Sequence, residues 1–292
     1  MKRALLALVL TTSACSSAVS GTATPLTGNL ALVNGPGTAA ALAGVRTAAE
    51  AVFSYDSANP AAFDQAVAAN VTGAAKGQLT TLFDQVRKSP QPVRLTTRVL
   101  RDAPLELAGG RVRELAVLDQ TSGTTKGLAT VALTALQEGG HWRLSDIAVN
   151  PAQPPPAPHP DDGTPAGLRD SALAGARQVA NALFTTDSAD PEGSYTRAEA
   201  IAADPLLSDY RAKKATYVEA IRKSGTKVAL GPDPMAGATA LTGGTASVLF
   251  FTTLKVTDAA GQATSRPYTV ELDLVRAGTG WKVTAVRTVT AE

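Results

Sequence analysis

Two acidic phrases in the chain contain residue types that could do chemistry. Segment 53–60 reads FSYDSANP and segment 184–191 reads FTTDSADP, so Asp56 and Asp187 occupy the same place in each. Paired carboxylates can serve general acid–base catalysis or hold a metal ion. The alternative is structural, because the Asn or Asp before each proline can cap a helix that begins at that proline. We favour the structural interpretation, since it accounts for every residue of the phrase.

The histidines are the next candidates, because histidine titrates near neutral pH and is a common acid–base group. The chain has two. His159 lies in a proline-rich segment, where we expect it to be solvated. His141 begins a predicted strand beside Trp142, and we interpret it as a surface residue at the strand edge, with a catalytic role as the alternative. Trp142 and Trp281 are expected to anchor terminal strands against helices, or alternatively to line a ligand pocket.

The single cysteine, Cys15, excludes an intrachain disulfide and a cysteine-based metal cluster. It ends the segment MKRALLALVLTTSAC, in which Lys2 and Arg3 precede an apolar run too short to span a bilayer. The end of this segment resembles a bacterial lipobox, although Thr12 departs from the aliphatic residue preferred there. We predict a signal peptide over 1–15 and lipidation of Cys15. The alternative is an ordinary cleaved signal with an incidental cysteine.

Composition describes a globular protein with little electrostatic bias. Hydrophobic residues make up 44% of the chain, charged residues 18% and aromatic residues 4%, and the net charge is +2. The acids and bases are interspersed, so the chain lacks the clustered basic face that nucleic-acid binding requires. Because aromatic residues are scarce, the cores must be built mainly from Val, Leu, Ile and Ala.

An internal repeat divides the chain. Segments 41–60 and 172–191 align without a gap, and twelve of their twenty positions are identical. The similarity continues in RKSPQPVRL and RKSGTKVAL, and again around the two tryptophans. Such repetition predicts a tandem domain duplication. We place a flexible tether at 16–38, the first domain at 39–150, a proline-rich linker at 151–165 and the second domain at 166–292.

Each repeat begins with a helical pattern and ends with a strand pattern. Apolar residues recur at steps of three and four early in the first repeat, at Leu42, Val45, Ala49, Val52 and Phe53. A second helical stripe is predicted from Leu79 to Val86, and its counterpart in the second repeat runs from Tyr210 to Ile221. Alternating patterns then predict strands near 130–135, 246–256 and 268–274. Helices followed by antiparallel strands define an α+β class, with helices covering one face of the sheet.

With last strands that contain W[KR][VL], both repeats resemble NTF2-like (cystatin-like) domains, and more narrowly the actinobacterial Mce-associated proteins. The resemblance covers 40–150 and 166–290. It implies two tandem cone domains, each with helices on a curved antiparallel sheet. The chain departs from that family in carrying a lipobox in place of a transmembrane helix, and two domains in place of one.

These observations lead us to expect a lipid-anchored cell-envelope protein, on the extracytoplasmic face of the cell membrane, with a binding or assembly role and no catalysis. Its expected partners are the membrane, through Cys15, and an envelope complex such as one for lipid transport. The first alternative is a carrier of an apolar small molecule or lipid in a cone pocket. The second is an isomerase- or dehydratase-like enzyme, which requires a buried polar pair. We predict no cofactor, no metal site and no catalytic residue.

Overall fold

Helices precede strands in both halves of the chain. The computed structural model describes residues 29–152 and 163–291. The first half, which we call domain 1, contains α1 Gly35–Val52, β1 Tyr55–Asp56, α2 Pro60–Asn70, α3 Ala75–Arg87, β2 Arg94–Ala108, β3 Arg111–Ser122, β4 Thr125–Glu138 and β5 His141–Val149. Cys15 and His159 lie outside the described residues.

The second half, domain 2, repeats this order with one more helix and a divided strand. It contains α4 Pro165–Phe184, β6 Thr186–Asp187, α5 Pro191–Ile201, α6 Leu206–Ala212, α7 Lys214–Ser224, β7 Lys227–Leu230, β8 Met235–Leu241, β9 Thr245–Thr257, β10 Ala263–Ala277 and β11 Gly280–Thr288. The single helix predicted from Tyr210 to Ile221 is in fact two, because the backbone leaves the helical conformation at Lys213.

The first helix of each domain begins at a polar cap followed by proline. The Asn34 side chain accepts a hydrogen bond from the Gly37 amide, and the Thr164 hydroxyl accepts one from the Gly167 amide. Such caps satisfy amides that the first helical turn leaves without partners. The cap at Asn34 starts α1 within the stretch 16–38 that the sequence analysis assigned to the tether, so the folded part begins earlier than predicted.

The sheets are antiparallel and curved. In domain 1 the order is β1-β2-β3-β4-β5, and in domain 2 it is β11-β10-β9-β7-β6, with β8 also pairing β9. Register shifts interrupt β2 twice, between Val99 and Arg101 and between Pro104 and Glu106. Bulges of this kind bend a strand and increase its twist, which lets each sheet wrap around its own helices.

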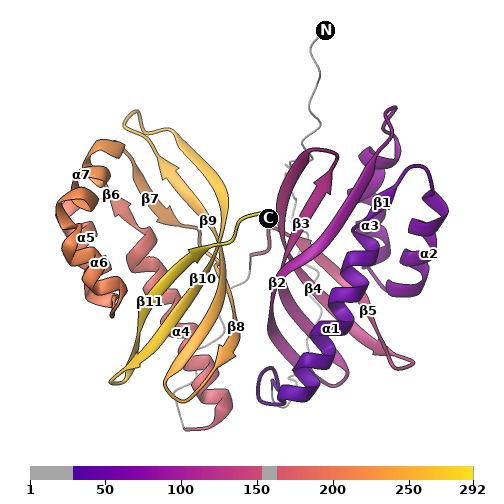
Figure 1. Cartoon of the computed structure of the whole chain (residues 1–292), viewed down its shortest axis with the longest axis horizontal. Helices are drawn as coiled ribbons and strands as arrows, with labels where there is room; N and C mark the ends of the chain where they lie inside the picture. Colours follow the sequence, from indigo (N-terminus) through magenta and orange to yellow (C-terminus); the bar gives the residue numbers. More distant parts are fainter. Residues whose placement is uncertain (1–28, 153–162, 292) are drawn as a thin grey trace.

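Each domain has its own core on the face of the sheet that its helices cover. Figure 1 shows the resulting arrangement, in which the two sheets face each other at the centre and helices cover the outer sides. Both domains are therefore α+β cones, as the sequence predicts for an NTF2-like fold. Within the described part of the chain, no helix is long and apolar enough to cross a membrane.

Candidate functional site

The two acidic phrases form matching corners, one in each domain. The carboxylate of Asp56 accepts a hydrogen bond from the Ala58 amide at 2.8 Å, and that of Asp187 accepts one from the Ala189 amide at 2.9 Å. In the second corner the Asp190 side chain also caps α5, as predicted, whereas the Asn59 side chain makes no cap hydrogen bond to α2, so that part of the prediction is wrong. The structure places Asp56 and Asp187 in separate domains, each holding its own turn, so it supports the structural interpretation.

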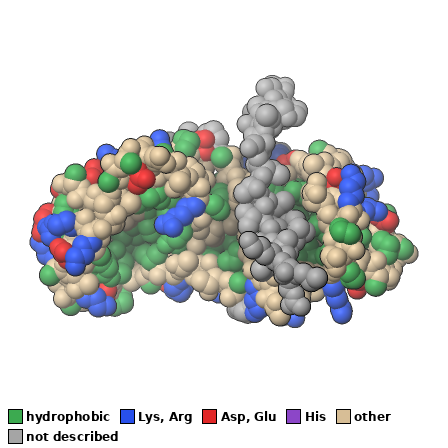
Figure 2. All heavy atoms as spheres, turned by 90° about the horizontal axis from the view of Figure 1, so that it is seen from above, with side chains coloured by type: hydrophobic (Ala, Val, Ile, Leu, Met, Phe, Trp, Pro, Cys, Tyr) green, Lys and Arg blue, Asp and Glu red, His purple; other side chains and the backbone are tan. Residues whose placement is uncertain are grey.

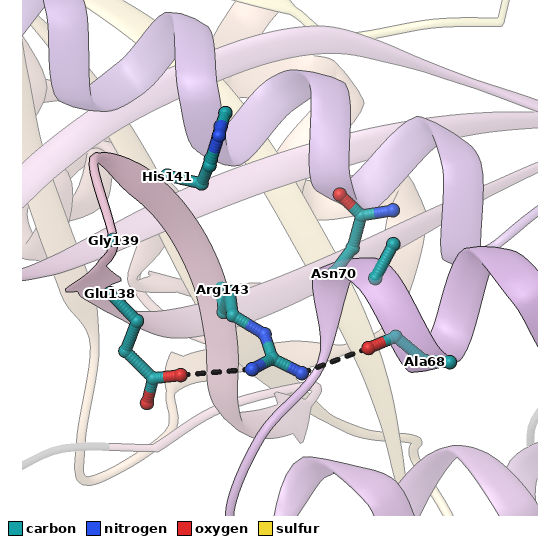
Figure 3. A pocket seen from close by; sticks show the side chains of 7 residues that line it. Ala68, Asn70, Glu138, Gly139, His141 and Arg143 are labelled. Carbon is teal, nitrogen blue, oxygen red and sulfur yellow. Dashed lines mark hydrogen bonds and ion pairs between the residues drawn. The ribbon is translucent and has the colours of Figure 1, made fainter.

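His141 lies beside a shallow polar pocket of about 570 Å³ at the edge of domain 1. The Arg143 guanidinium donates to the backbone oxygens of Ala68 and Val71, at 2.9 and 2.7 Å, and to the Glu138 carboxylate at 3.0 Å. Figure 3 shows this arginine reaching from β5 to the end of α2, with the His141 ring directed away from it. The arginine therefore satisfies helix-end carbonyls, and His141 is an exposed residue at the strand edge.

The two tryptophans hold β5 and β11 against the first helix of their domains. A side-chain carbon at Gly44 or Gly175 would overlap Trp142 or Trp281, respectively. The Trp281 indole also donates to the Ser171 hydroxyl at 3.0 Å. Glycine in each helix thus makes room for the ring, and the predicted anchoring role fits both tryptophans.

Sequence reasoning missed a buried acid, Glu114. Its side chain is fully buried, and neither carboxylate oxygen has a hydrogen-bond partner. Val112 and Ala116, two residues away on β3, belong to the core of domain 1, so Glu114 points into the same cone. Burial, reinforced by the nearby Asp102 carboxylate, raises the pKa of Glu114 well above its ordinary value. A weak signal was available, since Glu114 directly precedes the apolar run LAVL.

A surface ion pair lies close to this acid. The Nε and Nη2 groups of Arg46 on α1 donate hydrogen bonds to the two carboxylate oxygens of Asp102 on β2, at 2.9 to 3.2 Å. Asp102, Glu114 and Arg46 come nearest to the buried polar pair that an enzyme would require. However, the Asp102 charge is already neutralised by Arg46, and Glu114 has no exposed surface.

The equivalent positions in domain 2 have lost this acid cluster. Strand registers align Glu114 with Val248 and Asp102 with Ala236, and both counterparts are buried in the apolar core. Arg177 stands where domain 1 has Arg46, and burial lowers its pKa. The two cones therefore differ in their chemistry although they share a topology.

The cones also differ at the end that holds β1 and β6. In domain 1 the rings of Tyr55, Phe63 and Phe83 pack together, with centroids 4.8 to 6.2 Å apart. Their sequence counterparts in domain 2 are the smaller Thr186, Ser194 and Val218.

Neighbouring apolar residues follow the same trend. Val52, Phe53 and Leu95 are buried in domain 1, whereas their counterparts in domain 2 are half-buried, namely Leu183, Phe184 and Leu230. Viewed from this end, hydrophobic side chains gather in a hollow on the half of the molecule formed by domain 2 (Figure 2). Domain 2 packs a different set of rings, Tyr195, Tyr210 and Tyr217, with centroids 5.0 and 6.3 Å apart, and its apolar residues at this end are more exposed than those of domain 1.

The faces of the two sheets that carry no helices pack against each other. Their contact is an apolar cluster separate from both cores, formed by Ala103, Leu115, Val117, Ala132, Met235, Leu249 and Phe251. At one side of it the hydroxyls of Thr130 and Thr269 lie 2.8 Å apart. Arg101 of domain 1 pairs with Glu271 of domain 2 at 3.3 Å. We call this contact the sheet interface.

Equivalent residues meet at the sheet interface. Thr130 and Thr269 occupy the same place in the two sheets, and so do Ala103 and Gly237. A side-chain carbon added at Gly237 would lie only 2.7 Å from the Ala103 side chain. Contact between like positions is the mark of an approximate two-fold axis, as in a symmetric dimer.

A short segment before α1 joins the domains a second time. Ala31 belongs to the core of domain 1, whereas Leu32 packs against the core of domain 2. The buried Arg169 of α4 donates to the backbone oxygens of Asn29 and Ala31, at 2.8 and 3.0 Å. The Asn29 side chain in turn bonds the backbone of β2 at Leu105 and Leu107. We call residues 29–33 the junction segment.

Comparisons with known proteins give remote similarities only. No family model matches the chain, and no curated protein matches it. Among solved structures, a periplasmic fragment of TraM matches with 12% identity and a TM-score of 0.33, covering 41% of this chain and 97% of that one. The periplasmic domain of DotI matches with 17% identity and a TM-score of 0.32, covering 41% and 94%.

A third structure, an NTF2-like protein involved in plasmid conjugation, matches over more of the chain. Its identity is 11% and its TM-score 0.27, and the match covers 85% of this chain and 95% of that one. Because every score lies below 0.5, the fold described above rests on the coordinates themselves.

Proposed function

We propose that the protein is a lipid-anchored envelope protein that acts by binding and assembly on the extracytoplasmic face of the membrane, without catalysis. The leader and Cys15 support the anchor. The titratable candidates support the non-catalytic role, because Asp56, Asp187 and Arg143 are each engaged in holding a turn or a helix end.

The observation that carries this proposal is the sheet interface. It joins the two cones into one body through seven buried apolar residues, and it leaves the helices on both outer sides (Figure 1). A body of this kind presents α2 and α3 on one side and α5, α6 and α7 on the other. Two fixed, outward-facing helical surfaces suit a protein that holds two other envelope components at a set distance.

Co-purification from native membranes tests this role. The tagged full-length protein, extracted with mild detergent, should retain stoichiometric envelope partners. The variant Gly237→Val, which disturbs the sheet interface, should lose partners whose joint binding depends on the set distance between the two helical surfaces. Gly243→Val, placed in open space in the turn between β8 and β9, should keep them. Wild-type protein that leaves the membrane without any stable partner would contradict the assembly role.

The second candidate is a carrier of an apolar molecule, and the partly exposed apolar residues of the domain 2 cone favour it. Leu183, Phe184 and Leu230 are half-buried where their counterparts in domain 1 are buried. Native mass spectrometry of the protein should then detect an apolar ligand. The variant Val218→Phe, which introduces the residue found in domain 1, should release it. Wild-type protein free of ligand would argue against the carrier.

A further inference from the structure

Exposed large apolar side chains are concentrated where the described chain begins. Leu30 and Val33 are 43% and 40% exposed, and Leu128 is the third such residue in the described part of the chain, at 40%. Scattered single residues of this kind are common on protein surfaces. Two of them within the five-residue junction segment, which is otherwise held firmly on both domains, call for a specific explanation.

An apolar groove lies beside these residues. Its volume is about 310 Å³, and its lining includes Leu32, Pro165, Leu168 and Leu241. The groove therefore joins the junction segment to the start of α4 and to the hairpin that follows β8. Helices α1 and α4 both begin at this end of the molecule (Figure 1). Leu30, Leu32, Val33, Leu168 and Leu241 together define what we call the tether face.

The position of Cys15 sets how far this face can be from a bilayer. Only thirteen residues lie between Cys15 and Asn29, so even a fully extended chain spans at most about 50 Å. The junction segment is fixed to both domains by Arg169 and Asn29, so the anchor draws a defined end of the whole body toward the membrane.

We propose that the tether face rests on the surface of the lipid bilayer, with the side chains of Leu30 and Val33 entering the region between headgroups and acyl chains. This rests on the proposed lipid anchor at Cys15. A few apolar side chains bind a bilayer only weakly by themselves. The anchor raises their effective concentration at the membrane, so the second contact forms without paying the full cost of association. Docking would fix the orientation in which the helical sides face possible partners.

The test compares two positions of equal exposure at opposite ends of the sheet. Val33 lies by the β2–β3 hairpin end, since Leu30 bonds Leu107, whereas Leu128 lies near the β3–β4 hairpin. Val33→Cys and Leu128→Cys are each labelled with the fluorophore NBD in the lipidated protein, where acylation of Cys15 leaves one free thiol. The proteins are then reconstituted on vesicles of phosphatidylethanolamine and phosphatidylglycerol.

We expect the label at position 33 to shift its emission to shorter wavelength and to lose most of its intensity to nitroxide lipids, while the label at 128 changes little. Equal behaviour of the two labels would overturn the proposal. Flotation of the vesicles reports the anchor separately. If the protein does not float, the same labels in the chain from Cys15 onward with Cys15→Ser, mixed with excess vesicles, still decide whether position 33 contacts lipid.

A second pair of variants checks the contact without labels. With a large excess of the same vesicles, the weak contact should let part of the Cys15→Ser chain float. Leu30→Asp combined with Val33→Asp should abolish this flotation, and Leu128→Asp should leave it unchanged. These positions are exposed, so the fold tolerates the charges. Equal flotation of both variants would contradict docking through the tether face.

Discussion

Glu114 places a carboxyl group where the second domain has Val248. Both residues lie fully inside their cones, so the acid is not needed for the shape of the sheet. Burying a carboxyl group without a hydrogen-bond partner costs free energy, of the order of a few kcal/mol, and favours the protonated form. Glu114 therefore lowers the stability of domain 1, whereas Val248 at the same place in domain 2 does not carry this penalty.

The raised pKa of Glu114 predicts a pH-dependent stability. Because the folded state holds this proton more tightly than the unfolded state, the folded state binds more protons at every pH above the ordinary value of 4.5 and up to the raised one. The free energy of unfolding therefore falls as the pH rises through this window. Glu114→Gln should flatten that slope and raise the midpoint of urea unfolding at neutral pH.

The groups that face Glu114 must be considered with it. Asp102 adds to the rise in pKa, and Arg46 opposes it. Arg46→Met should therefore extend the fall in stability to higher pH. As a matched control, Glu192→Gln changes an exposed carboxylate and should leave the slope as it is. A slope that persists in Glu114→Gln would show that another group causes it.

At the scale of elements, the sequence predicted most of the fold. The strands at 130–135, 246–256 and 268–274 all lie within strands of the structure, because alternation and apolar runs report burial directly. The break of the predicted helix at Lys213 carries no such signal, since no proline or glycine marks it. Glu114 was missed for a related reason. Strand β3 has apolar residues on both faces. The sequence therefore did not indicate which face Glu114 lies on or that it is buried.

The close contact of helix and tryptophan gives a prediction at this scale. Gly175 lies in the middle of α4, and a side-chain carbon there would lie 2.7 Å from Trp281. Alanine normally stabilises a helix by up to about 1 kcal/mol relative to glycine. Here overpacking should outweigh this gain, so Gly175→Ala should lower the free energy of unfolding by ~1–3 kcal/mol.

Gly77 in α3 supplies the opposite case. Nothing lies within 4 Å of a side-chain carbon placed there, so Gly77→Ala should be neutral or stabilising by up to about 1 kcal/mol. Chemical denaturation of both variants measures the difference. If Gly175→Ala proved as stable as Gly77→Ala, close contact between the Trp281 ring and the backbone of α4 would not be what holds β11 in place.

The junction segment depends on one buried arginine. Arg169→Met removes the two hydrogen bonds to the backbone oxygens of Asn29 and Ala31. Hydrogen exchange at the amides of residues 30–32 should then become markedly faster. Arg177→Met, a change on the same helix away from the segment, should leave these amides protected. Unchanged exchange in Arg169→Met would show that apolar packing alone holds the segment.

At the scale of the whole molecule, the sequence allowed the pairing of the two sheets but did not require it. A tandem repeat is compatible with either linked, independent domains or a two-fold pair. The segment ASVLFFTTLKV, predicted as a deeply buried strand, contained the relevant signal. Phe250 faces the core of domain 2, whereas Leu249 and Phe251 face domain 1. A strand that buries both faces in an α+β sheet needs a second layer, and the other domain supplies it.

Gly237 is where this pairing can be tested. The side chain of valine there would overlap Ala103 and approach Leu105 across the sheet interface, so the sheets must separate or shift. Gly237→Val should therefore increase the radius of gyration measured by small-angle scattering. Each domain keeps its own core, so we expect unfolding to divide into two transitions. Gly243→Val, in open space in the turn between β8 and β9, should preserve both the size and the single transition. If Gly237→Val kept the wild-type size, the sheet interface would not be what holds the two cones together, and the junction segment would have to do so alone.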